Sequence, residues 1–322
     1  RRGGRYDDDP NVMSNGAPVE PLKRSENAWQ RPVAEDDPTS RPALMRKVNG
    51  LLNKLTFEKF DAIAAQIGEI PITDGDILRD VITLVFDKAL LEPKFSTMYA
   101  VLCSKIGPEL PEFEVGGGGG GGDDDAAAAG KKTTISFRRV LLRKCQEEFQ
   151  NPNNKPSANA AQIAALPEAE REDAEYKIKY RMLGNMKFIG ELYKRALLPE
   201  KVMHAVITSL IMSARQADIE DIERLCKLIV TIGPKLETST IAPGSLDRYF
   251  AEMEVFGANP ALPPRIRFLV RDTIELRKSD WKPRINTQDP KKLAELHSQM
   301  QEAAKFAALD AQILAERQGL VR

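Results

Sequence analysis

The sequence predicts an all-α protein built from successive helical hairpins. Three observations favour this fold: apolar residues recur at helical spacing, no stretch alternates as a strand would, and an Ile-Gly word returns at regular intervals. The word occurs at Ile67-Gly68, Ile106-Gly107, Ile189-Gly190 and Ile232-Gly233, in steps of 39, 83 and 43 residues. Since 83 residues are two steps of about 41, the period indicates a solenoid of paired-helix repeats of the HEAT type, about five in number.

The longest helical pattern runs from Tyr180 to Leu198. Its apolar residues define one buried face, formed by Met182, Met186, Ile189 and Tyr193. Gly184 and Gly190 interrupt this helix, and each glycine costs about 1 kcal/mol relative to alanine. We therefore expect a second helix to approach closely at both glycines, and Pro199 to end the helix.

Residues 1–40 are expected to form a disordered N-terminal arm, since they are rich in proline and poor in apolar residues. Trp29 stands alone in this polar stretch, within the sequence SENAWQRP. A lone tryptophan on such an arm is typical of an anchor, in cis or in trans. We expect Trp29 to dock against its own domain.

The helical repeats occupy residues 41–284. Sequence signals place helix starts at Thr56, the capping box Thr73 to Asp76, Asp218, Ser245 and Pro263-Pro264, and a helix end at Glu92-Pro93. Phe57 and Phe60 are both assigned to the inward face of the second helix. Glycine, aspartate and alanine dominate residues 116–130, which predicts a flexible insertion between helices. Residues 285–322 are expected to be a linker and an alanine-rich helix, free to stand off the body.

Composition argues against several classes of protein. Lys plus Arg and Asp plus Glu number 47 each, so no overall field attracts polyanions. Cys103, Cys145 and Cys226 lie far apart among apolar helical residues, which indicates buried reduced thiols. The sequence has two histidines, no cysteine and histidine spacing typical of zinc, no nucleophile with a histidine partner, and no phosphate-binding loop. It therefore predicts no enzyme, no cofactor and no metal. No apolar run approaches the roughly 18 residues of a membrane span, and no signal peptide is visible, so we expect a soluble protein of the nucleus or cytoplasm.

Basic residues gather in two places. Arg138, Arg139, Arg143 and Lys144 lie on one expected helix, and Arg265, Arg267 and Arg271 lie near the last hairpin. They form either a surface for RNA phosphates, whose affinity would fall steeply with salt, or simply solvated helix faces. The residues alone leave both interpretations open.

Six stretches follow one another along the chain in the order of a known family. They are LLNKLTFEKF from Leu51, FDKALLEPKFSTMYA from Phe86, FRRVLLRKCQEEF from Phe137, LGNMKFIGELYK from Leu183, LCKLIVTIGPKL from Leu225 and PRIRFLVRDTIELRKSDWKPR from Pro264. Together they resemble the middle domain of eukaryotic translation initiation factor 4 gamma, over residues 41–284, and SENAWQRP is similar to the segment just upstream. The large subunit of the nuclear cap-binding complex, a nonsense-decay factor and splicing factors share the fold, so a HEAT-type adaptor in RNA processing or decay is the alternative. LNKLT and SDWKPR favour initiation factor 4 gamma.

The resemblance implies a cytoplasmic scaffold that is not an enzyme, has no cofactor and does not contact membranes. Such a scaffold binds the DEAD-box RNA helicase of the cap-binding complex, initiation factor 4A, and stimulates it by favouring one arrangement of its two lobes. The resemblance also implies RNA binding and recruitment of mRNA to the small ribosomal subunit and the initiation factor 3 complex. The Tyr-x-x-x-x-Leu-apolar segment that would bind the cap-binding protein is not visible in residues 1–40. We therefore expect that contact to lie in regions outside this chain, as in a fragment of a larger factor, or the cap to be recruited differently.

Residues for helicase binding follow from the same resemblance. Leu52, Leu55, Phe60 and Phe268 match family positions needed for binding, and Trp29 belongs to the upstream segment. All four matching residues lie on apolar faces, so replacing one would also open a core cavity that costs about 2 to 5 kcal/mol. Turns are the exposed edge of a solenoid, so the better candidates for direct contact are Lys54, Thr56, Glu92, Pro93 and Lys94.

Overall fold

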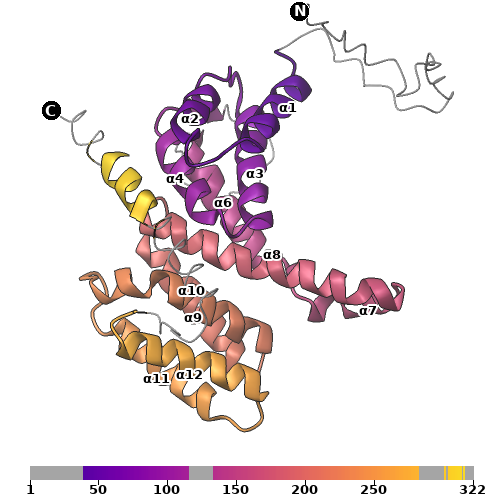
Figure 1. The fold of residues 1–322 in the computed structure, drawn as a ribbon, viewed down its shortest axis with the longest axis vertical. Helices are drawn as coiled ribbons and strands as arrows, with labels where there is room; N and C mark the ends of the chain where they lie inside the picture. The colour runs from indigo at the N-terminus through magenta and orange to yellow at the C-terminus, as the bar shows by residue number, and fades with distance from the viewer. Residues whose placement is uncertain (1–38, 116–132, 283–300, 302–303, 314, 316–322) are drawn as a thin grey trace, which may run out of the picture. The chain divides into compact units, whose positions relative to one another are not determined.

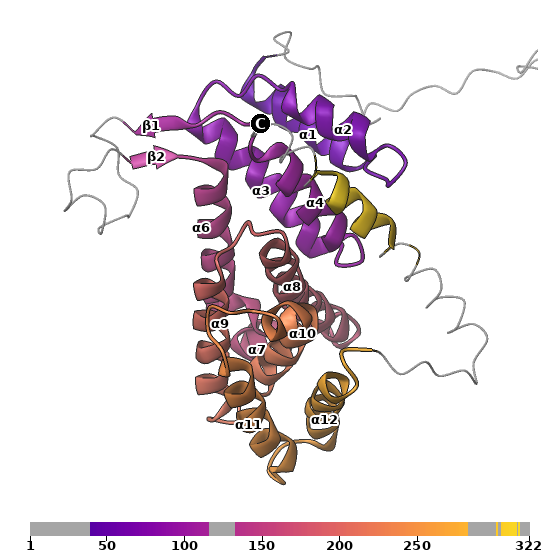
Figure 2. The same cartoon turned by 90° about the vertical axis from the view of Figure 1, so that its left-hand side faces the viewer.

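The computed structural model describes residues 39–115, 133–282, 301, 304–313 and 315. These residues form five consecutive helix pairs, α1 with α2, α3 with α4, α6 with α8, α9 with α10 and α11 with α12 (Figures 1 and 2). The predicted all-α, HEAT-type solenoid is therefore confirmed. Among the residues described, no helix is both long and apolar enough to cross a membrane.

The elements before the long central helix are α1 (Arg41–Leu52), α2 (Phe60–Gly68), α3 (Gly75–Leu91), α4 (Ser96–Ile106), β1 (Phe113–Val115), β2 (Thr133–Ile135) and α6 (Phe137–Gln150). Two short 3-10 turns, η1 (Pro152–Asn154) and η2 (Ser157–Asn159), and α7 (Ala160–Ala164) lead to α8 (Glu168–Lys194). The chain continues through α9 (Glu200–Ala214), α10 (Ile219–Glu237), α11 (Ser245–Ala258) and α12 (Pro264–Lys278).

The expectation that the chain has no strand is wrong at one place. β1 and β2 pair antiparallel, with Phe113 opposite Ile135 and Val115 opposite Thr133. Each strand has only three residues, too few for an alternating pattern to be visible in the sequence. The glycine-rich insertion begins directly after β1, and residues 116–130 lie outside the described part of the chain.

Several helix boundaries match the sequence signals. The side chain of Asp74 accepts hydrogen bonds from the backbone N–H groups of Asp76 and Ile77, at 2.9 and 2.8 Å, and thereby caps α3. Asp218 caps α10 in the same way, since it accepts from the N–H of Asp221 at 3.1 Å. The α3 helix ends at Leu91, directly before Glu92-Pro93, as predicted.

Three predicted boundaries are wrong. Thr56 does not cap a helix, because residues 56–59 form a turn and α2 begins only at Phe60. Ser245 is the first residue of α11, and Gly244, with a φ of 73°, takes the capping position. Helix α8 ends at Lys194 rather than at Pro199, because Ala196 turns the chain in the left-handed region at a φ of 57°.

Helix α8 connects the two ends of the solenoid and packs against α3, α4, α6 and α10. A Cβ on Gly184 would lie 2.8 Å from the carbonyl oxygen of Leu90 in α3. A Cβ on Gly190 would lie 2.6 Å from Cγ2 of Thr231 in α10. The expected close approach of a second helix is thus confirmed at both glycines, and each glycine serves a different neighbour.

Apolar side chains from all five pairs join one continuous core. The helix formed by residues 304–313 also adds Leu309 and Ile313 to this core, so in the structure it does not stand off the body. This helix is drawn in yellow beside α4 in both views (Figures 1 and 2).

Candidate functional site

The first predicted binding residues lie in the core of the first hairpin. Leu52, Leu55 and Phe60 are only 2, 8 and 1% exposed, respectively. Their side chains do not reach the surface. Any effect they have on a partner must therefore act through the shape of the α1–α2 turn that they hold.

The α1–α2 turn itself exposes Lys54 and Thr56, as expected for the edge of a solenoid. Of the predicted residues in the α3–α4 turn, Lys94 is exposed, whereas Glu92 and Pro93 are half-buried. The Glu92 carboxylate accepts a hydrogen bond from the Tyr99 hydroxyl at 3.0 Å, and the Pro93 carbonyl accepts one from Lys187 Nζ at 2.7 Å. Glu92 and Pro93 therefore shape the turn, and Lys94 is free to meet a partner.

Sequence reasoning missed three exposed apolar side chains beside these turns. Phe57, assigned to the inward face of α2, is 40% exposed, and Leu91 and Phe95 are 59 and 47% exposed. The inward assignment of Phe57 is wrong because α2 begins after it, so its position is not on the buried stripe of that helix. Large apolar residues around an exposed turn are typical of a protein-binding surface.

Phe268 differs from the other three residues that the resemblance selected. It is 60% exposed, so its assignment to an apolar buried face is wrong. Helix α12 buries a stripe formed by Ile266, Val270, Thr273 and Ile274, and Phe268 lies off that stripe. Helical spacing read from Ile266 would have shown this. Phe268 is therefore available for direct contact, at the opposite end of the solenoid from α1 and α2 (Figure 1).

Trp29, the expected anchor on the N-terminal arm, lies outside the described residues. Its docking stays a prediction.

The basic residues on α6 have partners within the protein. Arg138 donates hydrogen bonds to the carbonyls of Leu197 and Ala196, at 3.0 and 2.9 Å, where the chain leaves α8. Arg139 reaches the carbonyl of Thr134 at 3.4 Å. Arg143 and Lys144 both pair with Glu147, at 3.0 and 3.3 Å, on the exposed face of the helix.

Two of the three predicted basic residues on α12 also have partners within the protein. Arg265 pairs with Glu223, which is 3% exposed, and Arg271 donates to the carbonyl of Gly257 at 3.2 Å. The Nε of Arg267 is buried without a hydrogen-bond partner among the described residues. Helices α6 and α12 lie apart, with α8, α9 and α10 between them (Figure 2). The two basic clusters therefore do not form one continuous surface.

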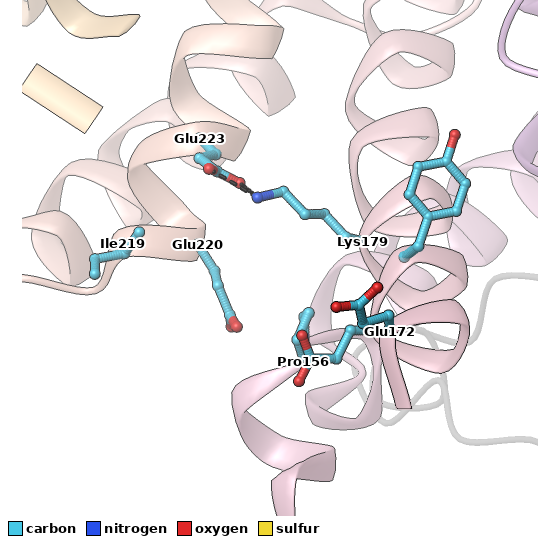
Figure 3. Close-up of a pocket in the computed structure, with 8 residues that line it drawn as sticks. Pro156, Glu172, Lys179, Ile219, Glu220 and Glu223 are labelled. Atoms are coloured by element: carbon cyan, nitrogen blue, oxygen red, sulfur yellow. Dashed lines mark hydrogen bonds and ion pairs between the residues drawn. The ribbon is translucent and has the colours of Figure 1, made fainter. Parts of the chain in front are cut away.

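A hollow of about 440 Å³ opens between α8 and α10, lined by Pro156, Glu172, Glu175, Tyr176, Lys179, Ile219, Glu220 and Glu223. Lys179 extends across it and pairs with Glu223 at 2.6 Å (Figure 3). Glu220 is held by the backbone N–H and hydroxyl of Ser157, at 2.9 and 2.7 Å. Within the described ranges no three histidine, cysteine or acidic side chains are grouped as metal ligands would be. The Lys179–Glu223 ion pair thus links α8 to α10 across the hollow.

Comparison with known proteins bears on what these surfaces do. A protein-family model described as the MIF4G domain matches residues 45–280. The chain belongs to this family. It is 34% identical over 302 residues to eukaryotic translation initiation factor 4G of Arabidopsis thaliana, which covers 92% of this chain. It is 37% identical over 272 residues, 83% of this chain, to eukaryotic translation initiation factor 4 gamma 2 of Mus musculus and of Homo sapiens.

As a MIF4G-domain protein of the initiation factor 4 gamma group, the chain spans only part of its relatives, 16% of the Arabidopsis protein and 29% of the mouse protein. A solved structure, the MIF4G domain of Trypanosoma cruzi translation initiation factor EIF4G5, superposes with a TM-score of 0.44 at 20% identity, covering 74% of this chain and 96% of that one. The match to the MIF4G model runs from α1 to α12, so it includes both the exposed hairpin turns and Phe268.

Proposed function

We propose that this MIF4G domain is a translation-initiation scaffold that binds and stimulates a DEAD-box RNA helicase, initiation factor 4A. The observation that carries the proposal is the distribution of exposed candidate residues at two ends of one solenoid. Lys54, Thr56 and Lys94 are exposed on the first two hairpins, and Phe268 is exposed on the last. The scaffold would have no catalytic role of its own.

Two separated contacts suit a helicase with two lobes. A scaffold that touches each lobe at a fixed distance from the other favours one lobe arrangement, provided that it binds that arrangement more tightly. The stiffness comes from α8, which packs against α3 and α4 on one side and against α10 on the other. In this proposal the first hairpins hold one lobe and α12 holds the second.

The test is the RNA-stimulated ATPase of the helicase, titrated with the full chain. Saturable stimulation is expected, and Phe268→Ala should weaken it because an exposed contact is removed. Met212→Ala is the matched control, since Met212 is a similarly exposed apolar residue, at 61%, on α9. No stimulation by a chain that circular dichroism shows to be helical would refute the scaffold role.

Charge reversal probes the opposite end. Lys54→Glu combined with Lys94→Glu should raise the concentration needed for half-maximal stimulation, because both cations are exposed on adjacent hairpin turns. Lys201→Glu is the matched control on α9, at the second residue of that helix. Equal weakening in the control would point to a nonspecific charge effect.

RNA binding is the second part of the proposal. Arg143 and Lys144 pair only with the surface carboxylate of Glu147 among the described residues, so phosphates can compete for them. Arg143→Gln with Lys144→Gln should lower RNA affinity and reduce the slope of log K against log salt by about 0.7 for each phosphate that is no longer neutralised. On α12, Arg265→Gln, Arg267→Gln and Arg271→Gln are the matching set. Unchanged affinity and slope in both sets would remove RNA from the proposal.

The wider role follows from these two activities. A scaffold that holds helicase and mRNA together would support mRNA recruitment to the small ribosomal subunit, with the initiation factor 3 complex as a further partner. Contact with the cap-binding protein is proposed to lie in regions outside this chain.

A further inference from the structure

The helix of residues 304–313 carries one apolar stripe and is otherwise exposed. Phe306, Leu309 and Ile313 follow one another at steps of three and four residues, and they face the body of the protein. Leu309 and Ile313 are 8 and 6% exposed. The remaining side chains described in this helix, apart from Asp310, are exposed. The helix is thus held by a narrow contact.

Three polar and aromatic contacts fix this helix at two different places on the body. The ring of Phe306 meets Phe57 edge to face, with centroids 5.8 Å apart, and Lys305 lies 5.5 Å from the centroid of the Phe57 ring. One helical turn further on, Asp310 accepts two hydrogen bonds from Arg195, at 3.1 and 2.7 Å. The helix therefore ties the α1–α2 turn to the end of α8.

Release of this helix leaves no buried charge without a partner. The Arg195 side chain is only 7% exposed, but it also pairs at 2.7 Å with Glu191 in the last turn of α8. Glu191 in turn pairs with Lys194 at 3.0 Å. When Asp310 leaves, Arg195 keeps this internal counter-ion, so the penalty that normally follows removal of one partner from a buried pair is avoided. Burial raises the pKa of Asp310 despite the neighbouring Arg195.

The covered residue belongs to the surface proposed for the helicase. Phe57 follows Thr56 directly, and Lys54 lies in the same turn. With Lys305 and Phe306 in contact with its ring, Phe57 is 40% exposed, so a partner that needs the rest of the ring must displace these two residues. The docked helix and the helicase would then both have to contact the Phe57 side chain.

We propose that the helix of residues 304–313 is a displaceable cover over Phe57, which competes with the helicase for the α1–α2 turn. This inference rests on the proposed function. Displacement removes Lys305 and Phe306 from the Phe57 ring, and the covered fraction of the chain sets the apparent affinity for the helicase. A chain whose binding-competent state is populated to a fraction f shows an apparent Kd larger than the intrinsic one by 1/f.

The test changes only the cover. In the full chain, Leu309→Ser with Ile313→Ser removes both buried anchors, and Ala308→Ser with Ala311→Ser changes exposed positions of the same helix. Hydrogen exchange of residues 304–313 reports docking without the helicase. Helicase binding is then measured separately on each chain.

The expected result is that exchange protection is lost only in the Leu309 and Ile313 variant, and that this variant binds the helicase about three- to tenfold more tightly. An undocked helix with unchanged or weaker helicase binding would overturn the cover while leaving the scaffold intact. Absence of protection in the unmodified chain would also overturn it. If no variant binds the helicase at all, the proposed function itself fails, and the competition fails with it.

Discussion

The indole ring of Trp281 lies directly on Gly233. A Cβ placed on Gly233 would be 1.9 Å from Cη2 of Trp281, closer than two non-bonded atoms can approach without movement. Trp281 also meets Phe250, whose ring centroid is 6.1 Å away in an edge-to-face arrangement. The Ile-Gly word at Ile232 therefore ends in glycine because a tryptophan from the end of the repeats closes over it.

Gly233→Ala should displace Trp281 and destabilise the last two hairpins. Overpacking of this kind costs about 1 to 3 kcal/mol. The intrinsic fluorescence should shift to longer wavelength as the indole becomes solvated, and the urea midpoint should fall. An alanine variant with unchanged fluorescence and midpoint would contradict the contact.

Gly184→Ala should destabilise the protein although alanine favours a helix. The new Cβ would lie 2.8 Å from the backbone oxygen of Leu90, which cannot turn away as a side chain could. Gly50→Ala is the control, since Gly50 also lies in a helix and has nothing within 4 Å of a Cβ. That control should stabilise the protein by about 0.5 to 1 kcal/mol. Thermal unfolding of the two variants should therefore move in opposite directions.

Asp221→Asn should destabilise the protein at neutral pH. Lys155 Nζ lies 2.7 Å from its carboxylate, and Arg224 Nη1 lies 2.8 Å away. Removing one partner of a buried pair costs about 3 kcal/mol or more. Urea unfolding of both proteins at pH 7 measures the difference.

The difference in unfolding free energy between the unmodified protein and Asp221→Asn should shrink in acid. Burial by itself would raise the pKa of Asp221, but its hydrogen bonds with Lys155 and Ser213 and the charge of Arg224 outweigh it, so the folded pKa is lowered. Because the pKa of Asp221 is lower in the folded than in the unfolded protein, its ionised carboxylate stabilises the fold at pH values above the unfolded pKa of about 3.9. The contribution is lost as pH falls through the folded pKa. A difference that stays constant down to pH 3 would show that Asp221 stabilises by shape alone.

Phe60→Ala and Phe268→Ala should separate folding from binding. Phe60 is 1% exposed, so its truncation should cost about 3 to 5 kcal/mol through a core cavity. Phe268 is 60% exposed, and its truncation should leave stability within about 0.5 kcal/mol. Loss of helicase stimulation by Phe268→Ala at unchanged melting temperature is the expected outcome. A large melting shift for this variant would show that its side chain supports the fold.

The cysteines should be unreactive in the native protein. Burial raises the pKa of Cys103 and of Cys226 to about 12, and it also raises the pKa of Cys145. Because the thiolate is the reactive form, an alkylating reagent at pH 8 should modify none of them until denaturant is added. Rapid native labelling of one thiol would reveal local opening at that helix.

The sequence predicted features that depend on neighbours along the chain. Asp74 and Asp218 cap helices because their carboxylates accept hydrogen bonds from backbone N–H groups in the first turn that follows. Such a cap can therefore be predicted from the local sequence. Close packing at Gly184 and Gly190 followed from their cost inside a helix, without knowledge of which helix approaches. The resemblance to the middle domain of initiation factor 4 gamma predicted the family, and the match of residues 45–280 to the MIF4G model confirms it.

Other features depend on residues far apart in the chain. Helix α8 ends early where Arg138 from α6 and Lys235 from α10 take up the carbonyls around its end, and no local signal marks Ala196 as the turning point. The docking of Asp310 requires Arg195, 115 residues away. For Phe268 the information was present, because the buried stripe that begins at Ile266 excludes it, but its assignment to an apolar face was made without following that stripe.

The β1 and β2 strands make one position in the chain tolerant of change. Val115 and Thr133 are cross-strand neighbours, so the two ends of the intervening sequence are held close together. Doubling the length of such a closed loop costs only about 0.6 kcal/mol. Lengthening the sequence between Val115 and Thr133 should therefore cost the solenoid little stability. For the same reason, a fluorescent domain inserted between these two residues would label the scaffold far from Phe268.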